Sequence, residues 1–311
     1  MITEVSIVIV NWNQKDLLKK CISSIYAETT QTNIEIIVVD NHSEDDSVAM
    51  LHVKFPNVQI IENQENVGFG RANNLAFQRA KGKYILLVNN DVTIPADTHA
   101  IDNMAAFLDA HPEIGIAGPK ILHPSGAIEP SCGNINFHTQ FSWEIFPFYH
   151  PIYHWLWRLR YAKGNHPREV EAVTGAFLLF RKEVLESIGG FDMFYFLYCE
   201  EIDWCKRAVD KGVRVFYLPQ FYVHHLRSAS AGGENLVRSL FEYYKSKNYF
   251  AKKFWPGWKA RLLSLCMYSG VIFRYLGWSA FFILGIRHEK AELMKEVLQY
   301  TIKRRKETFL F

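Results

Sequence analysis

The stretch Tyr84-Ile85-Leu86-Leu87-Val88-Asn89-Asn90-Asp91 decides the fold, because an unbroken apolar run ends in two amides and a carboxylate. Such a run predicts a strand that is buried on both faces. In open α/β sheets, ligands bind in the crevice beyond the carboxyl ends of the strands. The polar end of the stretch is therefore placed to hold a divalent metal against a diphosphate, since Mg²⁺ and Mn²⁺ prefer oxygen ligands. The same residues can also simply end the strand in a turn.

Around this stretch, short apolar runs alternate with helical patterns. Strands are expected at residues 5–10, 34–39, 58–61, 84–88 and 213–218, and regular structure of unassigned type at residues 170–180. Helices are expected at residues 15–26, 45–54, 70–80, 97–110, 181–188 and 201–211. This alternation predicts an α/β fold with a mostly parallel central sheet covered by helices on both faces.

Length, charge and cysteine usage limit the class of protein. A chain of 311 residues can bury a full core, as one large domain or one domain with an appendage. The net charge of +3 argues against a nucleic-acid partner. Five cysteines without a Cys-x-x-Cys pair argue against a disulfide framework or structural zinc and favour a reducing compartment. A strand expected to start at Val5 leaves no room for a signal peptide, so we expect a cytoplasmic location.

Polar segments also follow the first two predicted strands. Asn11 ends the first strand, and Asp40-Asn41-His42-Ser43 ends the second. The Asp40 carboxylate can accept a hydrogen bond from the imide N–H of uracil or thymine, or Asp40 and Ser43 can cap the next helix. The segment 66–74 opens a helix with glycines, and backbone N–H groups at such a helix start can bind anions. It follows the third strand and lacks a Gly-x-Gly-x-x-Gly pattern, which argues against a nicotinamide enzyme.

Two later clusters carry ionisable side chains. Glu200-Glu201-Ile202-Asp203-Trp204 puts three carboxylates at a helix start, where the helix dipole favours them. One of them can serve as a general base, or the three can form a charged first turn. The pair His224-His225 follows the strand expected at residues 213–218, and one of the two is a candidate metal ligand.

The C-terminal part of the chain differs in amino-acid composition. Residues 262–285 are apolar apart from Arg274 and a few serines, and as a helix they would extend about 36 Å. A charge at mid-membrane costs about 2.5–3.5 kcal/mol, so an in-plane or re-entrant membrane-associated helical pair is favoured over a transmembrane or soluble helix. Flanking lysines suit an anionic leaflet. Residues 141–161 hold nine aromatics and either pack on the core or line an acceptor or lipid site.

Taken together, the motifs resemble those of family-2 glycosyltransferases of the GT-A fold, most of all bacterial rhamnosyltransferase-type enzymes of cell-surface polysaccharide assembly. The resemblance runs in order through residues 5–230. The segments that carry it are Ser-Ile-Val-Ile-Val-Asn-Trp-Asn (6–13), Val-Val-Asp-Asn-His-Ser (38–43), Asn-Val-Gly-Phe-Gly-Arg-Ala-Asn-Asn (66–74), Leu-Val-Asn-Asn-Asp (87–91), Thr-Gly-Ala-Phe (174–177), Gly-Gly-Phe-Asp (189–192) and Glu-Glu-Ile-Asp-Trp (200–204).

The resemblance implies a role for each matching position. A nucleoside-diphosphate sugar would be bound by Asn11, Asp40, Asn41, Asn66, Gly68, Asn73 and Asn90. Mg²⁺ or Mn²⁺ would be held by Asp91 with His225, or with His224. The acceptor would be bound by Thr174, Gly175, Ala176 and Trp204. The family usually shows Glu-Asp-x-Asp with its second residue as base, which implies Glu201 here, with Glu200 and Asp203 as alternatives. Asn89 replaces the first carboxylate of the usual Asp-x-Asp, which should weaken metal affinity.

The expected activity is therefore inverting transfer of rhamnose or a similar sugar to a saccharide acceptor in polysaccharide assembly. The basic, aromatic C-terminus favours a lipid-linked acceptor and a peripheral position at the inner face of the cell membrane, and could equally mediate self-association. We expect a nucleotide-sugar-binding half (1–115), an acceptor-binding and catalytic half (116–240) and a C-terminal helical region (241–311).

Several alternatives to this expectation stay open. The chain could be a catalytically inactive nucleotide-sugar-binding protein, or a UDP-sugar-dependent hexosyl or N-acetylhexosaminyl transferase. Thymidine and uridine donors both suit Asp40, and guanosine is not excluded. A nucleotidyltransferase is disfavoured, since Asn11-Trp12-Asn13-Gln14 offers neither glycine nor a cation after the first strand.

Overall fold

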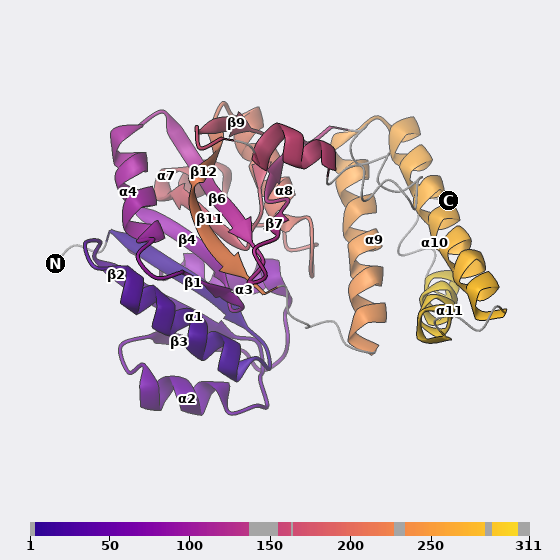
Figure 1. Ribbon diagram of the computed structural model, residues 1–311, viewed down its shortest axis with the longest axis horizontal. Coiled ribbons are helices and arrows are strands. Elements are labelled where there is room, and N and C mark those ends of the chain that lie inside the picture. Colours follow the sequence, from indigo (N-terminus) through magenta and orange to yellow (C-terminus); the bar gives the residue numbers. More distant parts are fainter. Residues whose placement is uncertain (1–3, 137–154, 163, 227–233, 284–287, 304–311) are drawn as a thin grey trace. The chain divides into compact units, whose positions relative to one another are not determined.

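The computed structural model describes residues 4–136, 155–162, 164–226, 234–283 and 288–303 (Figure 1). These residues form two compact units. The first consists of the described residues within 1–134, 157–196 and 200–227. The second consists of those within 135–156, 197–199 and 228–311.

A mixed sheet forms the centre of the first unit, with strand order β3-β2-β1-β4-β11-β6-β12-β5. The strands are β1 (Val5–Asn11), β2 (Ile34–Asp40), β3 (Gln59–Glu62), β4 (Tyr84–Asn89), β5 (Val92–Thr93), β6 (Ile114–Leu122), β11 (Phe177–Arg181) and β12 (Arg214–His225). β1 to β4 run parallel, β11 is antiparallel to both β4 and β6, and β12 runs parallel to β6. The predicted α/β fold is confirmed, with β11 reversing the otherwise mostly parallel order.

Short strands complete the first unit. β7 (Ile128–Glu129) pairs with β6, and β9 (Arg168–Val170) pairs with β12. β8 (Cys132–Gly133) and β10 (Ala172–Val173) pair with each other. The regular structure expected at residues 170–180 is thus divided between strands, because residues 174–176 separate β10 from β11. The strand expected at residues 213–218 instead runs to His225 through a bulge between Leu218 and Tyr222, so both histidines lie within β12.

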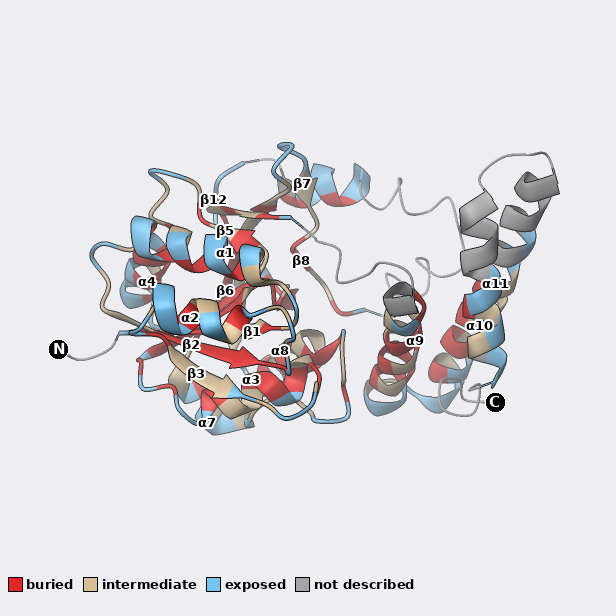
Figure 2. Cartoon of the chain, turned by 90° about the horizontal axis from the view of Figure 1, so that it is seen from below, coloured by how far each residue is buried: buried red, intermediate tan, exposed pale blue. Residues whose placement is uncertain are grey.

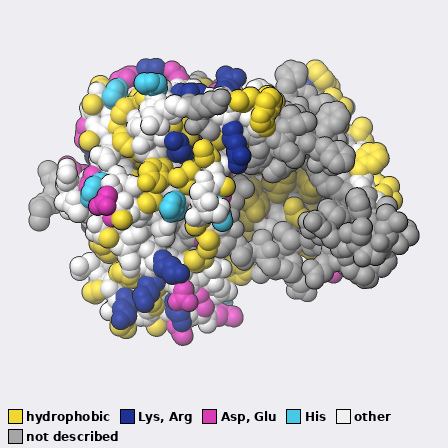
Figure 3. Space-filling model, in the orientation of Figure 1, with side chains coloured by type: hydrophobic (Ala, Val, Ile, Leu, Met, Phe, Trp, Pro, Cys, Tyr) yellow, Lys and Arg dark blue, Asp and Glu magenta, His cyan; other side chains and the backbone are white. Residues whose placement is uncertain are grey.

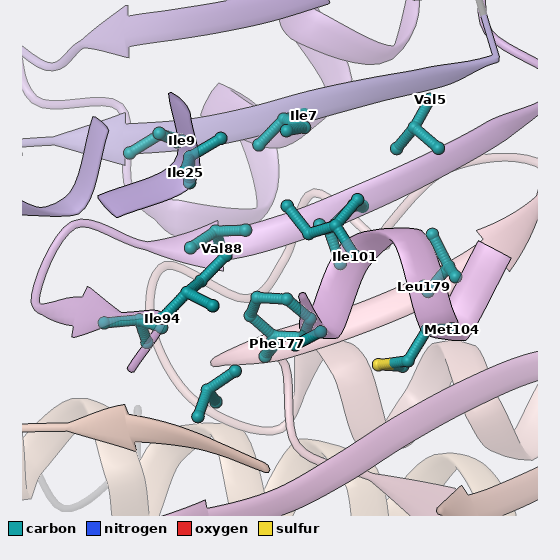
Figure 4. Packing of buried hydrophobic residues seen from close by; sticks show 14 of the residues in the cluster. Val5, Ile7, Ile9, Ile25, Val88, Ile94, Ile101, Met104, Phe177 and Leu179 are labelled. Atoms are coloured by element: carbon teal, nitrogen blue, oxygen red, sulfur yellow. The ribbon is translucent and has the colours of Figure 1, made fainter. Parts of the chain in front are cut away.

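Helices cover the sheet, and the hydrophobic core lies between these helices and the sheet. They are α1 (Lys15–Glu28), α2 (Ser47–Lys54), α3 (Phe69–Phe77), α4 (Ala100–Ala110), α7 (Lys182–Ile188), α8 (Glu200–Asp210) and the π-helix η1 (Arg158–Ala162). Strands β1 and β2 are largely buried, whereas α1 and α4 each keep an exposed side (Figure 2). In the main cluster, Ile101 and Met104 of α4 lie near Phe177 of β11 (Figure 4).

Three helices make up the described part of the second unit, namely α9 (Glu234–Phe254), α10 (Gly257–Ile283) and α11 (His288–Lys303). Tyr244, Leu263, Met267 and Val297 belong to the buried cluster that joins them. α9 stops at Phe254, two residues before Pro256, whose ring cannot continue a helix. Within the described residues, no helix is both long and apolar enough to cross a bilayer.

Two sequence features fall partly outside the described residues. Of the aromatic segment 141–161, residues 141–154 are not described. Within the remainder, Trp157 is buried, donates a hydrogen bond from Nε1 to the Cys132 carbonyl at 2.7 Å, and contacts the Tyr217 ring edge-on. This segment therefore packs on the core at Trp157. The Arg274 side chain also lies outside the described residues.

Candidate functional site

The carboxyl ends of β1, β2 and β4 are joined through one buried amide. Asn11 is aligned with Asp40 on the neighbouring strand. Its Nδ2 donates to Asp40 Oδ1 at 3.1 Å and to Ser43 Oγ at 3.2 Å. Its Oδ1 accepts from Asn90 Nδ2 at 2.8 Å. Three of the residues assigned to donor binding therefore meet at one edge of the sheet, where ligands bind in such folds.

Asp40 also closes the turn that follows its strand. Its Oδ2 accepts the Ser43 backbone N–H at 2.8 Å, and Ser43 Oγ accepts the Asn13 N–H at 2.9 Å. Asp40 and Ser43 therefore stabilise the turn and do not cap the next helix, since α2 begins at Ser47 with Asp46 as its N-cap. Each carboxylate oxygen has a second lone pair, so the same group retains capacity for a nucleobase N–H.

The segment that opens α3 is fixed by protein contacts. Asn41 donates to the Gly68 carbonyl at 3.3 Å, and Asn66 Oδ1 accepts the Gly68 N–H at 3.0 Å. The Phe69 N–H donates to the Phe196 carbonyl at 2.8 Å, and Asn73 donates to the Phe69 carbonyl. The backbone N–H groups of Gly68 and Phe69, which were expected to bind an anion, therefore already donate to protein oxygens. Gly68 has a φ of +85°, and a Cβ there would lie 2.5 Å from the Phe196 carbonyl oxygen.

At the end of β4, Asp91 meets one of the two candidate histidines. Asp91 Oδ1 lies 3.1 Å from His225 Nε2, and Glu129 Oε2 lies 3.4 Å from His225 Nδ1. Burial by itself would lower the pKa of His225, but the hydrogen bonds and charges of Asp91 and Glu129 outweigh it and raise this pKa to about 9. Side chains alternate along a strand, so His224 projects to the other face of β12, where its ring lies 6.2 Å from that of Tyr222. The structure brings Asp91 together with His225 and not with His224.

The donor chemistry of this pair fits Mn²⁺ or Mg²⁺. A carboxylate oxygen and a neutral imidazole nitrogen are both ligands for such ions, with the imidazole better suited to Mn²⁺ than to Mg²⁺. A cation bound here would displace the proton that Asp91 and Glu129 stabilise on His225. Among the described residues, no group of three or more His, Cys, Asp or Glu side chains is placed to hold a metal. Asp91 and His225 would therefore supply two ligands, and diphosphate oxygens and water the remainder. Asn89 Nδ2 lies 3.5 Å from His225 Nε2 and is an uncharged neighbour of the pair.

Two carboxyl groups at the start of α8 each keep one oxygen without a partner. Oε2 of Glu200 and Oε2 of Glu201 are each shielded from solvent and have no hydrogen-bond partner among the described residues. Burial raises the pKa of Glu201, opposed in part by backbone N–H groups including that of Gly175. Burial and then the charge of Glu201 raise the pKa of Glu200 further. A carboxyl in such surroundings is suited to take up a proton, which is what a general base does.

Segment 174–176 links the metal side of the site to these carboxyls. The Asn89 N–H donates to the Ala176 carbonyl at 3.0 Å. A Cβ added to Gly175 would lie 3.4 Å from Glu201 Cβ, so the two residues are in close contact. Thr174, which precedes them, is only partly buried and is anchored by its N–H to the Ser131 carbonyl. The segment therefore places Glu201 near the end of β4.

Trp204, assigned to acceptor binding, lies in the core. It is fully buried, its Nε1 donates to the Gly189 carbonyl at 2.8 Å, and its ring packs 4.6 Å from that of Phe180. A residue in this environment has no surface to offer a saccharide, so we leave it out of the acceptor site. The apolar side of an amphipathic helix would have predicted this burial.

Asp203 is buried and fully engaged. Its Oδ1 accepts from Arg207 Nε at 2.8 Å and its Oδ2 from the Tyr195 hydroxyl at 3.0 Å. Arg207 in turn donates to the carbonyls of Ile188 and Gly190. Through these contacts, Asp203 and Arg207 hold α8 against the preceding loop. Sequence reasoning missed Arg207, although its position four residues after Asp203 is the spacing of helical ion pairs.

Replacing Asp203 with asparagine should lower the free energy of unfolding by about 2–3 kcal/mol, because the charge of Arg207 would lose its buried partner. Urea unfolding of the variant and the native chain measures the difference. Turnover per folded molecule should stay within a few-fold of the native value. A variant with native stability and no turnover would instead make Asp203 a catalytic residue.

Comparison with known proteins gives three findings. The family model described as glycosyl transferase family 2 matches residues 6–189. The O-antigen biosynthesis protein RfbC of Myxococcus xanthus is 26% identical over 82% of this chain, which spans only 19% of that protein's length. The N-acetylglucosaminyl-diphospho-decaprenol L-rhamnosyltransferase of Mycobacterium tuberculosis is 24% identical over 81% of this chain and 85% of its own.

Among solved structures, the mannosyltransferase PcManGT of Pyrobaculum calidifontis, in complex with GDP-Man and Mn²⁺, superposes with a TM-score of 0.59. The match covers 98% of this chain and 88% of that one at 16% identity. At this identity the likeness establishes the fold alone, a mixed α/β fold of the GT-A type around a central sheet.

Proposed function

This chain belongs to glycosyl transferase family 2, and from that premise we propose that it transfers a sugar from a nucleoside-diphosphate donor to a saccharide acceptor. The observation that carries the proposal is the pairing of two features beside segment 174–176. One is the Asp91–His225 pair at the end of β4, which suits a diphosphate-bound cation. The other is the shielded, unpartnered Oε2 of Glu201.

The donor in this proposal is a nucleoside-diphosphate sugar whose base lies against Asp40. Asn11 and Ser43 hold the Asp40 carboxylate in place, so that its remaining lone pairs can accept the imide N–H of thymine or uracil. Asn41 and Asn66 shape the adjoining loop through their contacts with Gly68. Asn73 supports the first turn of α3. The similarity to rhamnosyltransferases favours rhamnose or a related sugar.

In the proposed reaction, Glu201 Oε2 takes the proton of an acceptor hydroxyl as its oxygen attacks the anomeric carbon. The new carbon–oxygen bond forms on one face while the bond to the diphosphate oxygen breaks on the other, so the configuration inverts. A bound Mg²⁺ or Mn²⁺ would neutralise charge on the leaving diphosphate. Asp91 and His225 would hold that cation, while Asn90 stays fixed to Asn11.

For the acceptor, we propose a lipid-linked saccharide reached from the cytoplasmic face of the cell membrane. The Mycobacterium tuberculosis relative is named for a lipid-linked saccharide, N-acetylglucosaminyl-diphospho-decaprenol. The basic C-terminal region of the present chain suits a membrane surface. Gly175 lies next to Glu201, where the reacting hydroxyl must be held, and Thr174 precedes it in the chain. The donor side then comes from residues 1–115, the acceptor side and base from 116–240, and membrane contact from 241–311.

Nucleoside diphosphates should raise the melting temperature of the chain in the presence of Mn²⁺. A ligand at a hundredfold excess over its dissociation constant stabilises a protein by about 2.7 kcal/mol. We expect dTDP or UDP to give the largest shift, GDP and ADP less, and Mn²⁺ alone little. Asp40→Asn should reduce the pyrimidine preference. No shift with any of the four nucleotides would contradict a nucleotide-sugar site at this edge of the sheet.

A further inference from the structure

Helix α10 carries large apolar side chains on a surface that faces away from its own unit. Trp258 is 64% exposed, Leu265 53%, Phe273 66% and Leu276 54%. Trp258 and Leu276 are 18 residues apart, which is five helical turns, and Leu265 falls about two turns after Trp258. They therefore share one side of the helix over about 27 Å, with Phe273 beside them. We call these four residues the outer face of α10.

The opposite side of the same helix is already occupied. Ala260, Leu263, Met267 and Val271 are buried against α9 and α11. A helix on a water-exposed surface normally presents polar residues on its outer side, so a helix that is apolar on both sides has a second apolar environment to explain. Hydrophobic side chains lie at the surface over α10 in Figure 3.

Positive charge gathers at one end of the outer face. Lys252 and Lys253 are exposed in the last turn of α9, and Lys259 and Arg261 lie in the first turns of α10. Residues 243–288 contain no aspartate or glutamate in the sequence. An apolar surface with cations at one end complements a bilayer that contains anionic lipids, since each such cation strengthens binding. Tryptophan at the cationic end also prefers the interface between headgroups and hydrocarbon.

We propose that the outer face of α10 lies in the headgroup region of a membrane that carries anionic lipid. Leu265, Phe273 and Leu276 enter the boundary of the acyl chains, and the cations contact lipid phosphates. The inference rests on the proposed function in one respect, because a lipid-linked acceptor would be held in that same surface. Docking itself requires neither donor nor turnover.

Sedimentation with lipid vesicles tests this proposal with the full chain. The native chain should bind vesicles of phosphatidylcholine and phosphatidylglycerol, and bind phosphatidylcholine alone more weakly, with a further loss at high salt. The double variant Leu265→Glu/Phe273→Glu should partition about tenfold or more weakly. Lys252→Glu/Lys253→Glu should lose a similar factor on anionic vesicles only. Val53→Glu, at a 75% exposed position on α2, is the matched control and should bind as the native chain does.

Three results would overturn the proposal. The first is vesicle binding by Leu265→Glu/Phe273→Glu at the native level, and the second is no vesicle binding by the native chain. The third is a native dimer that this variant converts to a monomer without any vesicle binding, which would make a second copy the occupant of the face. Circular dichroism confirms that the variants fold. Nucleoside-diphosphate binding measured on the same samples keeps the two proposals apart, because it should persist in every variant whether or not vesicles bind.

Discussion

Replacing Glu201 with glutamine should lower kcat by about 10²–10⁴-fold while leaving the affinity for the nucleoside diphosphate unchanged. Glutamine keeps the size of the side chain but cannot accept the proton of the acceptor hydroxyl. Glu201 is singled out because its Oε2 is shielded and unpartnered and because it lies against Gly175. Asp203, by contrast, already has both oxygens engaged. Initial rates of nucleoside-diphosphate release at saturating donor measure the effect.

Two companion variants make this result specific. Glu200→Gln removes the neighbouring carboxyl, whose Oε2 also lacks a partner, and should reduce kcat less, since that residue lies one position away from the Gly175 contact. Glu186→Gln, at an exposed position on α7, should have no effect. Full loss in Glu200→Gln with retained turnover in Glu201→Gln would transfer the role of base to Glu200.

The pH dependence follows from the same carboxyl. A general base must be ionised, and burial raises the pKa of Glu201. The native kcat/KM should therefore fall as the pH is lowered, and fall at a pH above the ordinary glutamate value of about 4.3.

Replacing Asp91 with alanine should remove most of the gain in nucleoside-diphosphate affinity that Mn²⁺ provides, about 10²-fold. Asp91 is the one carboxylate in the stretch 89–91, and it reaches His225 at 3.1 Å. Without it, one ligand of a two-residue set is lost, and His225 keeps only Glu129 as its acidic neighbour. Calorimetric titration of the nucleotide with and without Mn²⁺ gives both affinities.

The control for this variant is Asp97→Asn. It removes the same charge six residues further along, at an exposed position whose positive φ asparagine tolerates. Its Mn²⁺-dependent affinity should equal that of the native chain. If Asp91→Ala also kept the full Mn²⁺ effect, Asp91 would not be a metal ligand.

Local pattern was sufficient for the first part of the fold. In residues 5–89, apolar runs and helical periods each match one element, and the polar ends of β1, β2 and β4 converge because parallel strands end at the same edge. The sequence pattern did not predict where a strand ends when pairing with a distant strand determines its length. β12 continues past Leu218 because β6 pairs with it on both sides of a bulge.

Predicting the full length of β12 would have shown which of the two histidines meets Asp91. Once His224 and His225 lie in one strand, their side chains must face opposite ways, and only one of them can meet Asp91. The Glu129 contact had no comparable signal, because β7 is only two residues long. Helix spacing would have paired Asp203 with Arg207, four residues later in α8, whereas the contact of Tyr195 with Asp203 comes from the preceding loop and had no such signal.

The most direct test of the central claim is a transfer reaction with the purified chain, Mn²⁺, a panel of thymidine-, uridine- and guanosine-diphosphate sugars, and a lipid-linked saccharide acceptor. Mass spectrometry of the lipid and release of the nucleoside diphosphate are measured together. We predict that one pyrimidine donor, a rhamnose or related sugar nucleotide, extends the acceptor by a single sugar, and that Glu201→Gln does not. A chain that binds nucleoside diphosphate yet extends no acceptor with any donor would contradict the account and leave a nucleotide-sugar-binding protein.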